Sequence, residues 1–202
     1  MEGNTYGYLE IILGPMFSGK TSKLIEIYKQ YAFCQLDTLV INHMHDNRYS
    51  SSSSTNSCSQ ETQLYSHDQI HIPCVQANSL RSVIHDHIDM FTSSTPFAVF
   101  INEGQFFHDL YASVVEMVQE HKVHVYIAGL DGDFKREKFG QILDLIPLCD
   151  KVCKLHSLCV YCKNGTNAIF SYRKDCKNKQ QTQIGANDTY SPVCRKCYGE
   201  CS

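Results

Sequence analysis

The residues with the clearest capacity for chemistry form a glycine-rich run near the N-terminus, Gly14-Pro15-Met16-Phe17-Ser18-Gly19-Lys20-Thr21. The run fits the pattern GxxxxGK followed by Ser or Thr, whose glycines let the backbone turn its N–H groups toward phosphate oxygens. In this pattern Lys20 contributes a cation for the β- and γ-phosphates, and Thr21 contributes a hydroxyl ligand for Mg²⁺. We therefore predict that the loop binds the phosphates of a nucleoside triphosphate.

A carboxylate is the second candidate for chemistry. Glu103 directly follows the apolar run Phe97–Asn102, where a side chain emerges at the carboxyl edge of a predicted sheet. A carboxylate at that edge can accept the proton of an attacking hydroxyl that lies within hydrogen-bond reach. Position alone leaves a second interpretation open, in which Glu103 is a surface glutamate in a loop.

Four of the eleven cysteines form two CxxC pairs, Cys159 with Cys162 and Cys194 with Cys197. Two such pairs can place four thiolates around one tetrahedral Zn²⁺, which leaves no open position for catalysis. Disulfides are the alternative. The segment from Met1 to Leu9 lacks the basic-then-apolar order of a signal peptide, which favours a reducing compartment and a structural metal.

These residues need a framework, and the hydrophobic pattern predicts one. Short apolar runs alternate with helical patterns, which is typical of a mostly parallel sheet with helices on both faces and a site at the carboxyl ends of the strands. The predicted strands are Tyr8–Leu13, Thr38–Asn42, Phe97–Asn102 and His124–Ala128. The predicted helices are Thr21–Phe33, Leu80–Met90 and Tyr111–Glu120. The fold class is an α/β phosphate-loop protein.

The composition changes near residue 154, from apolar runs to cysteines and short polar stretches. We expect a nucleotide-binding domain over residues 1–153 and a small zinc-binding domain over residues 154–202, in which the metal replaces a large core. The serine-rich stretch Ser50–Gln60 is low in complexity and is expected to be a mobile surface loop.

Composition excludes several classes of function. Hydrophobic residues make up 43% and charged residues 19%, as in globular proteins, and the net charge is −3. This charge gives no broad basic surface for nucleic acid or an anionic membrane. No apolar run approaches the roughly 20 residues of a membrane span. We expect a cytoplasmic protein that binds neither nucleic acid nor membrane.

The motifs, taken in order, resemble the type II thymidine kinases, the cytosolic and poxvirus-like enzymes that phosphorylate thymidine with ATP. The matching stretches are ILGPMFSGKT, HDNRYSS, INEGQFF, AGLDGDFKREKFG, LCVYC, IGANDTY and PVCRKCY. They extend from about Leu9 to Cys197, which is nearly the whole chain. Their shared order is far more specific than any one of them.

The resemblance implies a role for each matching position. Glu103 would be the general base for the 5′-hydroxyl of thymidine. Lys20 and Arg48 would offset charge during phosphoryl transfer. ATP and Mg²⁺ would contact the loop from Gly14 to Thr21 together with Asp46, Arg48, Asn102 and Gln105. Thymidine would contact Met16, Leu130, Phe134, Phe139, Gln181, Thr182, Gln183, Ile184, Gly185 and Tyr190, the glutamine-to-glycine stretch being part of a lasso that closes over the base.

Residue type and position alone leave plainer interpretations open for some of these residues. Phe134, Phe139 and Tyr190 could be core residues, and Asp46 with Arg48 could be a solvated surface pair. The family has Asp immediately before the general base, where this chain has Asn102. This difference predicts weaker Mg²⁺ binding with the chemistry retained. The alternative function is a non-catalytic nucleotide-binding zinc protein derived from this family. The resemblance also implies a homotetramer inhibited by dTTP.

Overall fold

The central sheet is built from short apolar runs that include most of the strands predicted above. The computed structural model describes residues 6–44, 62–65, 70–174, 180–181 and 189–201. Seven strands follow the spatial order β3-β4-β2-β5-β6-β1-β7, and every neighbouring pair is parallel except β3 with β4. Their bounds are β1 Tyr8–Leu13, β2 Asp37–His43, β3 Thr62–Tyr65, β4 His71–Ala77, β5 Phe97–Asn102, β6 His124–Gly129 and β7 Lys151–Lys154.

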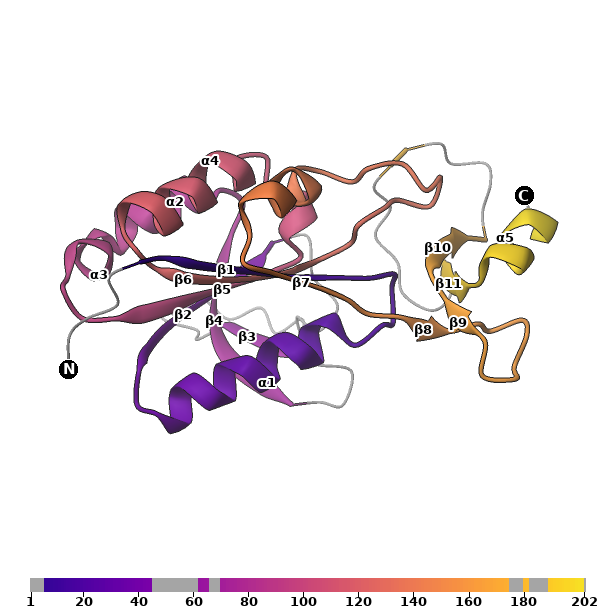
Figure 1. The fold of residues 1–202 in the computed structure, drawn as a ribbon, viewed down its shortest axis with the longest axis horizontal. Helices are drawn as coiled ribbons and strands as arrows, with labels where there is room; N and C mark the ends of the chain where they lie inside the picture. Colours follow the sequence, from indigo (N-terminus) through magenta and orange to yellow (C-terminus); the bar gives the residue numbers. More distant parts are fainter. Residues whose placement is uncertain (1–5, 45–61, 66–69, 175–179, 182–188, 202) are drawn as a thin grey trace, which may run out of the picture.

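Helices cover both faces of this sheet, as a doubly covered parallel sheet requires. Helix α1 lies against one face, and α2, α3 and α4 lie against the other (Figure 1). The helices are α1 Lys20–Phe33, α2 Leu80–Asp86, α3 Ile88–Thr92 and α4 Leu110–Val115, with the 3₁₀ turns η1 Gly104–Phe106 and η3 Ile142–Leu148 and the π turn η2 Glu116–Glu120. The predicted α/β fold is confirmed.

The alternation of side chains along β5 divides the core into two layers. Ala98 and Phe100 point into the layer beneath α1, where Phe100 stacks on Tyr126 with ring centroids 5.2 Å apart. Val99 and Ile101 point into the opposite layer, beneath α2, α4 and η3. Because every residue of β5 is buried, this strand is a fixed support for whatever follows its carboxyl end.

Some element boundaries differ from the sequence predictions. The helix predicted over Leu80–Met90 is two helices, α2 and α3, separated at His87. The pattern predicted as a helix over Tyr111–Glu120 continues from α4 into the π turn η2. The predicted mobile stretch Ser50–Gln60 lies outside the described residues. Among the described helices, none is long and apolar enough to cross a membrane.

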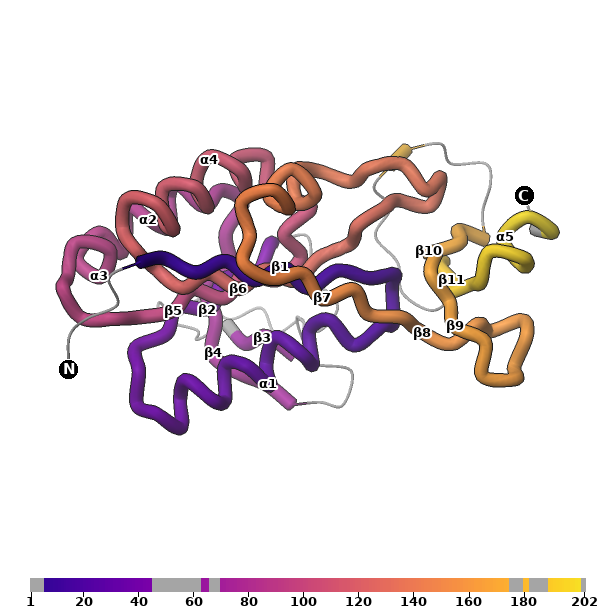
Figure 2. The backbone as a smooth tube through the Cα atoms, in the orientation of Figure 1, coloured from indigo at the N-terminus to yellow at the C-terminus, as the bar shows by residue number. Residues whose placement is uncertain are grey.

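Beyond β7 the chain leaves the sheet edge and forms a small C-terminal unit (Figure 2). It contains two short antiparallel pairs, β8 with β9 and β10 with β11, followed by one helix. Its own small core includes Ala168, Val193 and Tyr198 beside three cysteines. The elements are β8 Ser157–Leu158, β9 Asn167–Ala168, β10 Phe170–Arg173, β11 Tyr190–Val193 and α5 Arg195–Cys201.

One partly buried capping contact gives a stability prediction. Asp109 Oδ2 accepts hydrogen bonds from the Ser79 hydroxyl at 2.7 Å and the Arg81 N–H at 2.9 Å, at the start of α2. Burial raises the pKa of Asp109, but these hydrogen bonds outweigh it and hold the pKa below its ordinary value of 3.8. We expect Asp109→Ala to lower the free energy of unfolding by about 1 kcal/mol at pH 7.

The pH dependence of this difference follows from the direction of the shift. A lowered carboxyl pKa stabilises the fold above the unfolded pKa and ceases to do so as the pH falls through the folded pKa. Urea unfolding of both proteins at pH 7 and at steps below 3.8 measures the difference. A difference that stayed constant over that range would show that the charge of Asp109 contributes nothing.

Candidate active site

The phosphate loop connects β1 to α1 and depends on two glycines. A Cβ on Gly14 would lie 2.6 Å from Ser18 Oγ and 2.7 Å from Leu155 O, so a side chain there would collide with the loop itself. Gly19 has φ of 82°, a left-handed conformation that favours glycine, and its missing Cβ faces open space. The loop therefore exposes backbone at the N-terminal end of α1, which is the favoured place for an anion.

Two side chains of the loop have the properties that a phosphate site requires. Lys20 is buried, and its Nζ donates to Pro15 O at 2.8 Å across the loop. Ser18 Oγ is buried and has no hydrogen-bond partner among the described residues. A buried hydroxyl without a partner is destabilising, and phosphate oxygens are suitable acceptors for it. The residues present thus fit a bound triphosphate.

A chain of polar side chains connects the loop to two strand ends. Thr21 Oγ1 donates to Asn102 Oδ1 at 3.1 Å, and Asn102 Nδ2 donates to Asn42 Oδ1 at 2.9 Å. Asn42 and Asn102 are register partners at the ends of β2 and β5, and both are buried. This arrangement presents hydroxyl and amide oxygens beside the loop, and oxygens are the ligands that Mg²⁺ prefers.

Glu103 stands immediately after β5 in a left-handed backbone conformation, with φ of 54° and ψ of 42°. Such a conformation is unfavourable for a residue with a side chain and is concentrated at functional sites. Gln105 Nε2 donates to Glu103 Oε2 at 2.6 Å, and Gln105 Oε1 accepts the Leu130 N–H at 2.9 Å. Buried Gln105 thereby fixes the carboxylate of Glu103 relative to the chain that follows β6.

Three of the predicted nucleoside-binding residues, Met16, Phe134 and Tyr190, contact residues of strand β10 in the C-terminal unit. Met16 N–H donates to Ser171 Oγ on β10 at 2.9 Å. The guanidinium of Arg173, on the same strand, lies 3.7 Å from the ring centroid of Phe134 and 5.2 Å from that of Tyr190. Phe139 packs edge-on against Phe106, with ring centroids 5.4 Å apart. Phe106 lies three residues after Glu103, the predicted general base.

The remaining predicted site residues divide into described and undescribed ones. Gln181 is described, and its Nε2 donates to Asp133 Oδ2 at 2.9 Å. Asp46 and Arg48, predicted beside the triphosphate, lie outside the described residues. The same holds for the predicted lasso residues Thr182, Gln183, Ile184 and Gly185.

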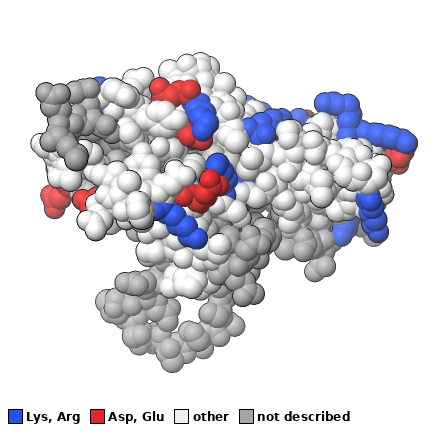
Figure 3. Space-filling view, turned by 60° about the horizontal axis from the view of Figure 1, so that its bottom comes forward, with Lys and Arg blue, Asp and Glu red and all other residues white. Residues whose placement is uncertain are grey.

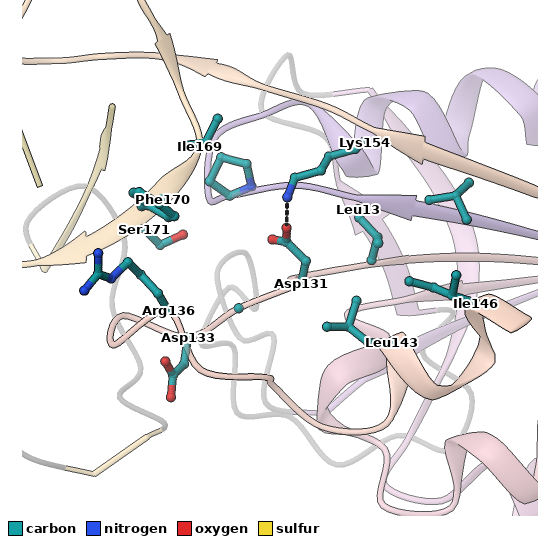
Figure 4. Close-up of a pocket in the computed structure, with 13 residues that line it drawn as sticks. Leu13, Asp131, Asp133, Arg136, Leu143, Ile146, Lys154, Ile169, Phe170 and Ser171 are labelled. Atoms are coloured by element: carbon teal, nitrogen blue, oxygen red, sulfur yellow. Dashed lines mark ion pairs between the residues drawn. The ribbon is translucent and has the colours of Figure 1, made fainter. Parts of the chain in front are cut away.

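A pocket of about 360 Å³ lies between the end of β1, the chain after β6, and β10 (Figure 4). Its walls include Leu13, Pro15 and Ser171, and an ion pair of 2.7 Å between Lys154 Nζ and Asp131 Oδ2 crosses it. None of the predicted nucleoside-binding residues lines this pocket. Because Pro15 belongs to the phosphate loop and Ser171 to β10, the pocket lies between the phosphate loop and the C-terminal unit.

The four CxxC cysteines converge in the C-terminal unit. Their sulfur atoms all lie within 4.8 Å of one another, with Cys162 Sγ 3.7 Å from Cys194 Sγ and 3.4 Å from Cys197 Sγ. A tetrahedron with Zn–S bonds of about 2.3 Å has S···S edges of roughly 3.8 Å, so the sulfur atoms fit zinc. The described cysteines, including Cys159, form no disulfide.

Backbone groups favour the thiolate form of one cysteine of this cluster, Cys159, whereas hydrogen bonds with neighbouring thiols raise the pKa values of Cys162 and Cys197. Burial raises the pKa of Cys159, but the backbone N–H groups of Cys162, Cys194 and Tyr161 lower it to about 6. The thiolate is the metal-binding form of cysteine. The donor set and its polar surroundings thus match a closed four-cysteine metal centre.

Charged side chains of both signs are mixed on the face drawn in Figure 3. Ion pairs among the described residues include Lys151 with Glu10 at 3.0 Å and Lys138 with Asp144 at 2.6 Å. On this face Asp and Glu lie mainly at the left, over the larger part of the molecule, and the charged side chains at the right-hand end are mostly Lys and Arg.

Sequence reasoning missed several residues of this region. Asn42 ends a predicted strand, and that position is a usable signal because the carboxyl ends of parallel strands meet at one edge. Ser171 and Arg173 lie in none of the matching stretches, and Asp133 lies in AGLDGDFKREKFG but was assigned no role, since the contacts of all three arise where the C-terminal unit meets the rest of the chain.

A phosphate loop after the first strand of a parallel sheet, with polar groups at neighbouring strand ends, defines a nucleotide-binding α/β protein of the phosphate-loop class. The family model described as Thymidine kinase matches residues 7–198. The thymidine kinase of Sheeppox virus (strain KS-1) is 38% identical over 193 residues, which cover 96% of this chain and 97% of that protein. The thymidine kinase of Variola virus is 38% identical over 193 residues, covering 95% and 97%. The chain belongs to the thymidine kinase family.

Proposed function

We propose that this protein transfers the γ-phosphoryl group of ATP to the 5′-hydroxyl of thymidine, giving dTMP for DNA synthesis. The observation that carries the proposal is the family match over nearly the whole chain, together with a complete phosphate loop beside Glu103. Retention of Lys20, Thr21 and Glu103 argues against the alternative of a non-catalytic relative, which would have no reason to keep a proton acceptor next to the loop.

The residue roles follow from the chemistry of phosphoryl transfer, which depends on positioning and charge stabilisation more than on covalent catalysis. The loop from Gly14 holds the triphosphate of ATP, and Lys20 offsets its charge. Glu103, oriented by Gln105, accepts the proton of the 5′-hydroxyl. Thr21 and Asn102 are the residues that would hold Mg²⁺, and the ion would supply positive charge against the charge that develops during transfer.

In this proposal the thymine base lies among the aromatic and apolar side chains of Met16, Leu130, Phe134, Phe139 and Tyr190. These come from the phosphate loop, the chain after β6, and β11, so the pocket forms where the C-terminal unit meets the sheet. Closure of such a pocket excludes water, which would otherwise compete for the phosphoryl group. Residues 154–202 thus act as a nucleoside-binding unit that structural Zn²⁺ holds in shape.

Further proposals rest on the family resemblance alone. They are a cytoplasmic homotetramer, inhibition by dTTP, and contributions of Asp46 and Arg48 near the triphosphate. The binding partners are thymidine and ATP, with no nucleic acid or membrane partner.

Transfer of labelled phosphoryl from ATP to nucleosides tests the proposal. We expect the purified protein with ATP and Mg²⁺ to convert thymidine to its 5′-monophosphate, with a kcat/KM for deoxycytidine lower by at least about 100-fold. Discrimination of that size is reachable when a buried site must pair the polar edge of a base. Equal rates with both nucleosides would contradict a thymine-specific pocket.

The neutral residue at position 102 gives a prediction about magnesium. Asn102→Asp places a full negative charge beside Thr21, and the Asn42 carboxamide can rotate to donate to it. A charge near a solvated dication contributes on the order of 1 kcal/mol after screening, which corresponds to a roughly fivefold change in the Mg²⁺ concentration for half-maximal rate.

Titration of the rate with Mg²⁺ at saturating ATP and thymidine measures this change. We expect Asn102→Asp to need less Mg²⁺ than the unchanged protein, and the control Asn102→Ala, which removes the oxygen, to need more. An identical requirement in all three proteins would place the metal away from residue 102.

A further inference from the structure

Arg173 is a buried cation on β10 that the phosphoryl-transfer mechanism does not use, and it is only 2% exposed. Its Nε and Nη2 donate to the hydroxyl of Tyr190 on β11, at 3.1 and 2.6 Å. Its Nη1 and Nη2 also donate to the main-chain carbonyls of Gln180 and Gln181, at 2.6 and 2.9 Å. One guanidinium therefore ties the β10–β11 pair to the start of a different chain segment.

The same guanidinium also reaches the main body of the protein. It lies over the ring of Phe134 at 3.7 Å from the centroid, which is a close cation–π contact. Phe134 belongs to the chain between β6 and η3, which extends from the sheet toward the C-terminal unit (Figure 1). Arg173 thus contacts two rings from two parts of the fold, Phe134 and Tyr190, and both belong to the proposed thymine pocket.

Two further hydrogen bonds hold the chain around Phe134. Tyr198 OH donates to Phe134 O at 2.7 Å, and Gln181 Nε2 donates to the neighbouring Asp133 Oδ2 at 2.9 Å. The Tyr198 contact supports the backbone of this segment without the guanidinium, whereas Gln181 is itself held by Arg173 through its carbonyl. What Arg173 adds is the orientation of the Phe134 ring, the orientation of the Tyr190 ring, and the position of the Gln180–Gln181 carbonyls.

We infer that Arg173 is a positioning residue for nucleoside binding, which sets the two aromatic walls of the thymine pocket at the spacing that the base requires. This inference rests on the proposed function, because it takes Phe134 and Tyr190 as pocket walls. Arginine suits the role because its planar guanidinium stacks on a ring while its edge donates several hydrogen bonds, whereas lysine keeps the charge but loses that geometry.

Arg173→Lys tests the inference directly. We expect the Kd for thymidine, measured by titration calorimetry, and the KM for thymidine to rise by roughly 10- to 100-fold, the range expected when pocket groups move by about 1 Å. The KM for ATP should stay within about twofold, because none of the contacts described above for Arg173 involves the phosphate loop. Arg195→Lys is the matched control, since exposed Arg195 also lies over a ring, that of Phe170, at 5.3 Å.

Tyr190→Phe supplies a second variant that needs no change to the buried charge. It keeps the ring and removes only the hydroxyl that accepts from Arg173. We expect a smaller rise in the thymidine Kd, and a double variant whose effect is less than the product of the two single effects. Zinc content and thermal unfolding of each variant separate positioning from loss of structure.

The outcomes separate this inference from the proposed function. If the unchanged protein binds no thymidine, both are overturned. If it binds thymidine and Arg173→Lys binds it equally well, only the inference falls. If the KM values for thymidine and ATP rise together while zinc is lost, and Tyr190→Phe is unaffected, Arg173 has a structural role alone and the inference is overturned.

Discussion

Replacing Glu103 with Gln should reduce kcat for thymidine phosphorylation by about 10²- to 10⁴-fold, the usual contribution of a general base. Glutamine is nearly isosteric and can still accept the hydrogen bond from Gln105 Nε2, which lies 2.6 Å from the carboxylate. Because the geometry is retained and only the proton acceptor is lost, the KM values for ATP and thymidine should change little. Initial rates over a range of both substrates measure the effect.

A matched glutamate tests whether the loss is specific to the site. Glu26 is exposed on α1, where it pairs with Lys23 at 2.9 Å, and Glu26→Gln should leave kcat unchanged. A Glu103→Gln protein that kept kcat within about threefold of the unchanged enzyme would mean that another group accepts the proton. The left-handed backbone of residue 103 would then need a different explanation.

Replacing Cys162 with Ser should release zinc and lower the free energy of unfolding by on the order of 5 kcal/mol or more, since binding of a structural zinc is largely folding free energy. Cys162 Sγ lies within 3.7 Å of Cys194 Sγ and Cys197 Sγ, so its loss opens the cluster. The damage should reach the nucleoside pocket, because α5 holds Phe134 O through Tyr198. We expect the KM for thymidine to rise at least roughly tenfold.

Zinc release to a coloured chelator, thermal unfolding and steady-state kinetics measure the three effects together. Cys34→Ser is the control, because Cys34 is a free, exposed cysteine at the end of α1 and should tolerate serine. A Cys162→Ser protein that lost its zinc but kept its stability and its KM for thymidine would contradict this prediction. It would show that neither folding nor nucleoside binding depends on the metal.

The buried centre of the fold was predictable from the sequence because its strands are continuous apolar runs. β1, β2, β5 and β6 match the predicted strands closely, and α1 begins at Lys20, one residue before the prediction. In such strands both faces are covered, so hydrophobicity alone identifies them.

The edges of the sheet were not predictable in the same way. Strand β7, Lys151–Lys154, is one edge strand and is largely exposed; β3 is the other edge strand, and its neighbour β4 contains Pro73 and several partly exposed residues. Edge strands pair on one side only and carry polar residues and proline, so their pattern is weak. The C-terminal strands are shorter still and are supported by the cysteine cluster.

Candidate site positions could be proposed from the sequence where a residue follows a recognisable strand, as Glu103 does, or belongs to the phosphate-loop pattern, as Thr21 does. The partners of those residues depend on which strands are neighbours. Asn42 and Asn102 are register partners although they are far apart in the sequence, and the hydrogen bond between them requires that β2 lies next to β5. Arg173 depends in addition on how the C-terminal unit packs against the chain after β6.

The most direct test of the central claim measures ATP binding and phosphoryl transfer on one sample of the unchanged protein. With ATP, Mg²⁺ and thymidine, we expect saturable ATP binding and the formation of one ADP and one thymidine 5′-monophosphate for each ATP consumed. Saturable binding of ATP with thymidine recovered unchanged would contradict this account, and would instead support a non-catalytic nucleotide-binding protein on a thymidine kinase fold.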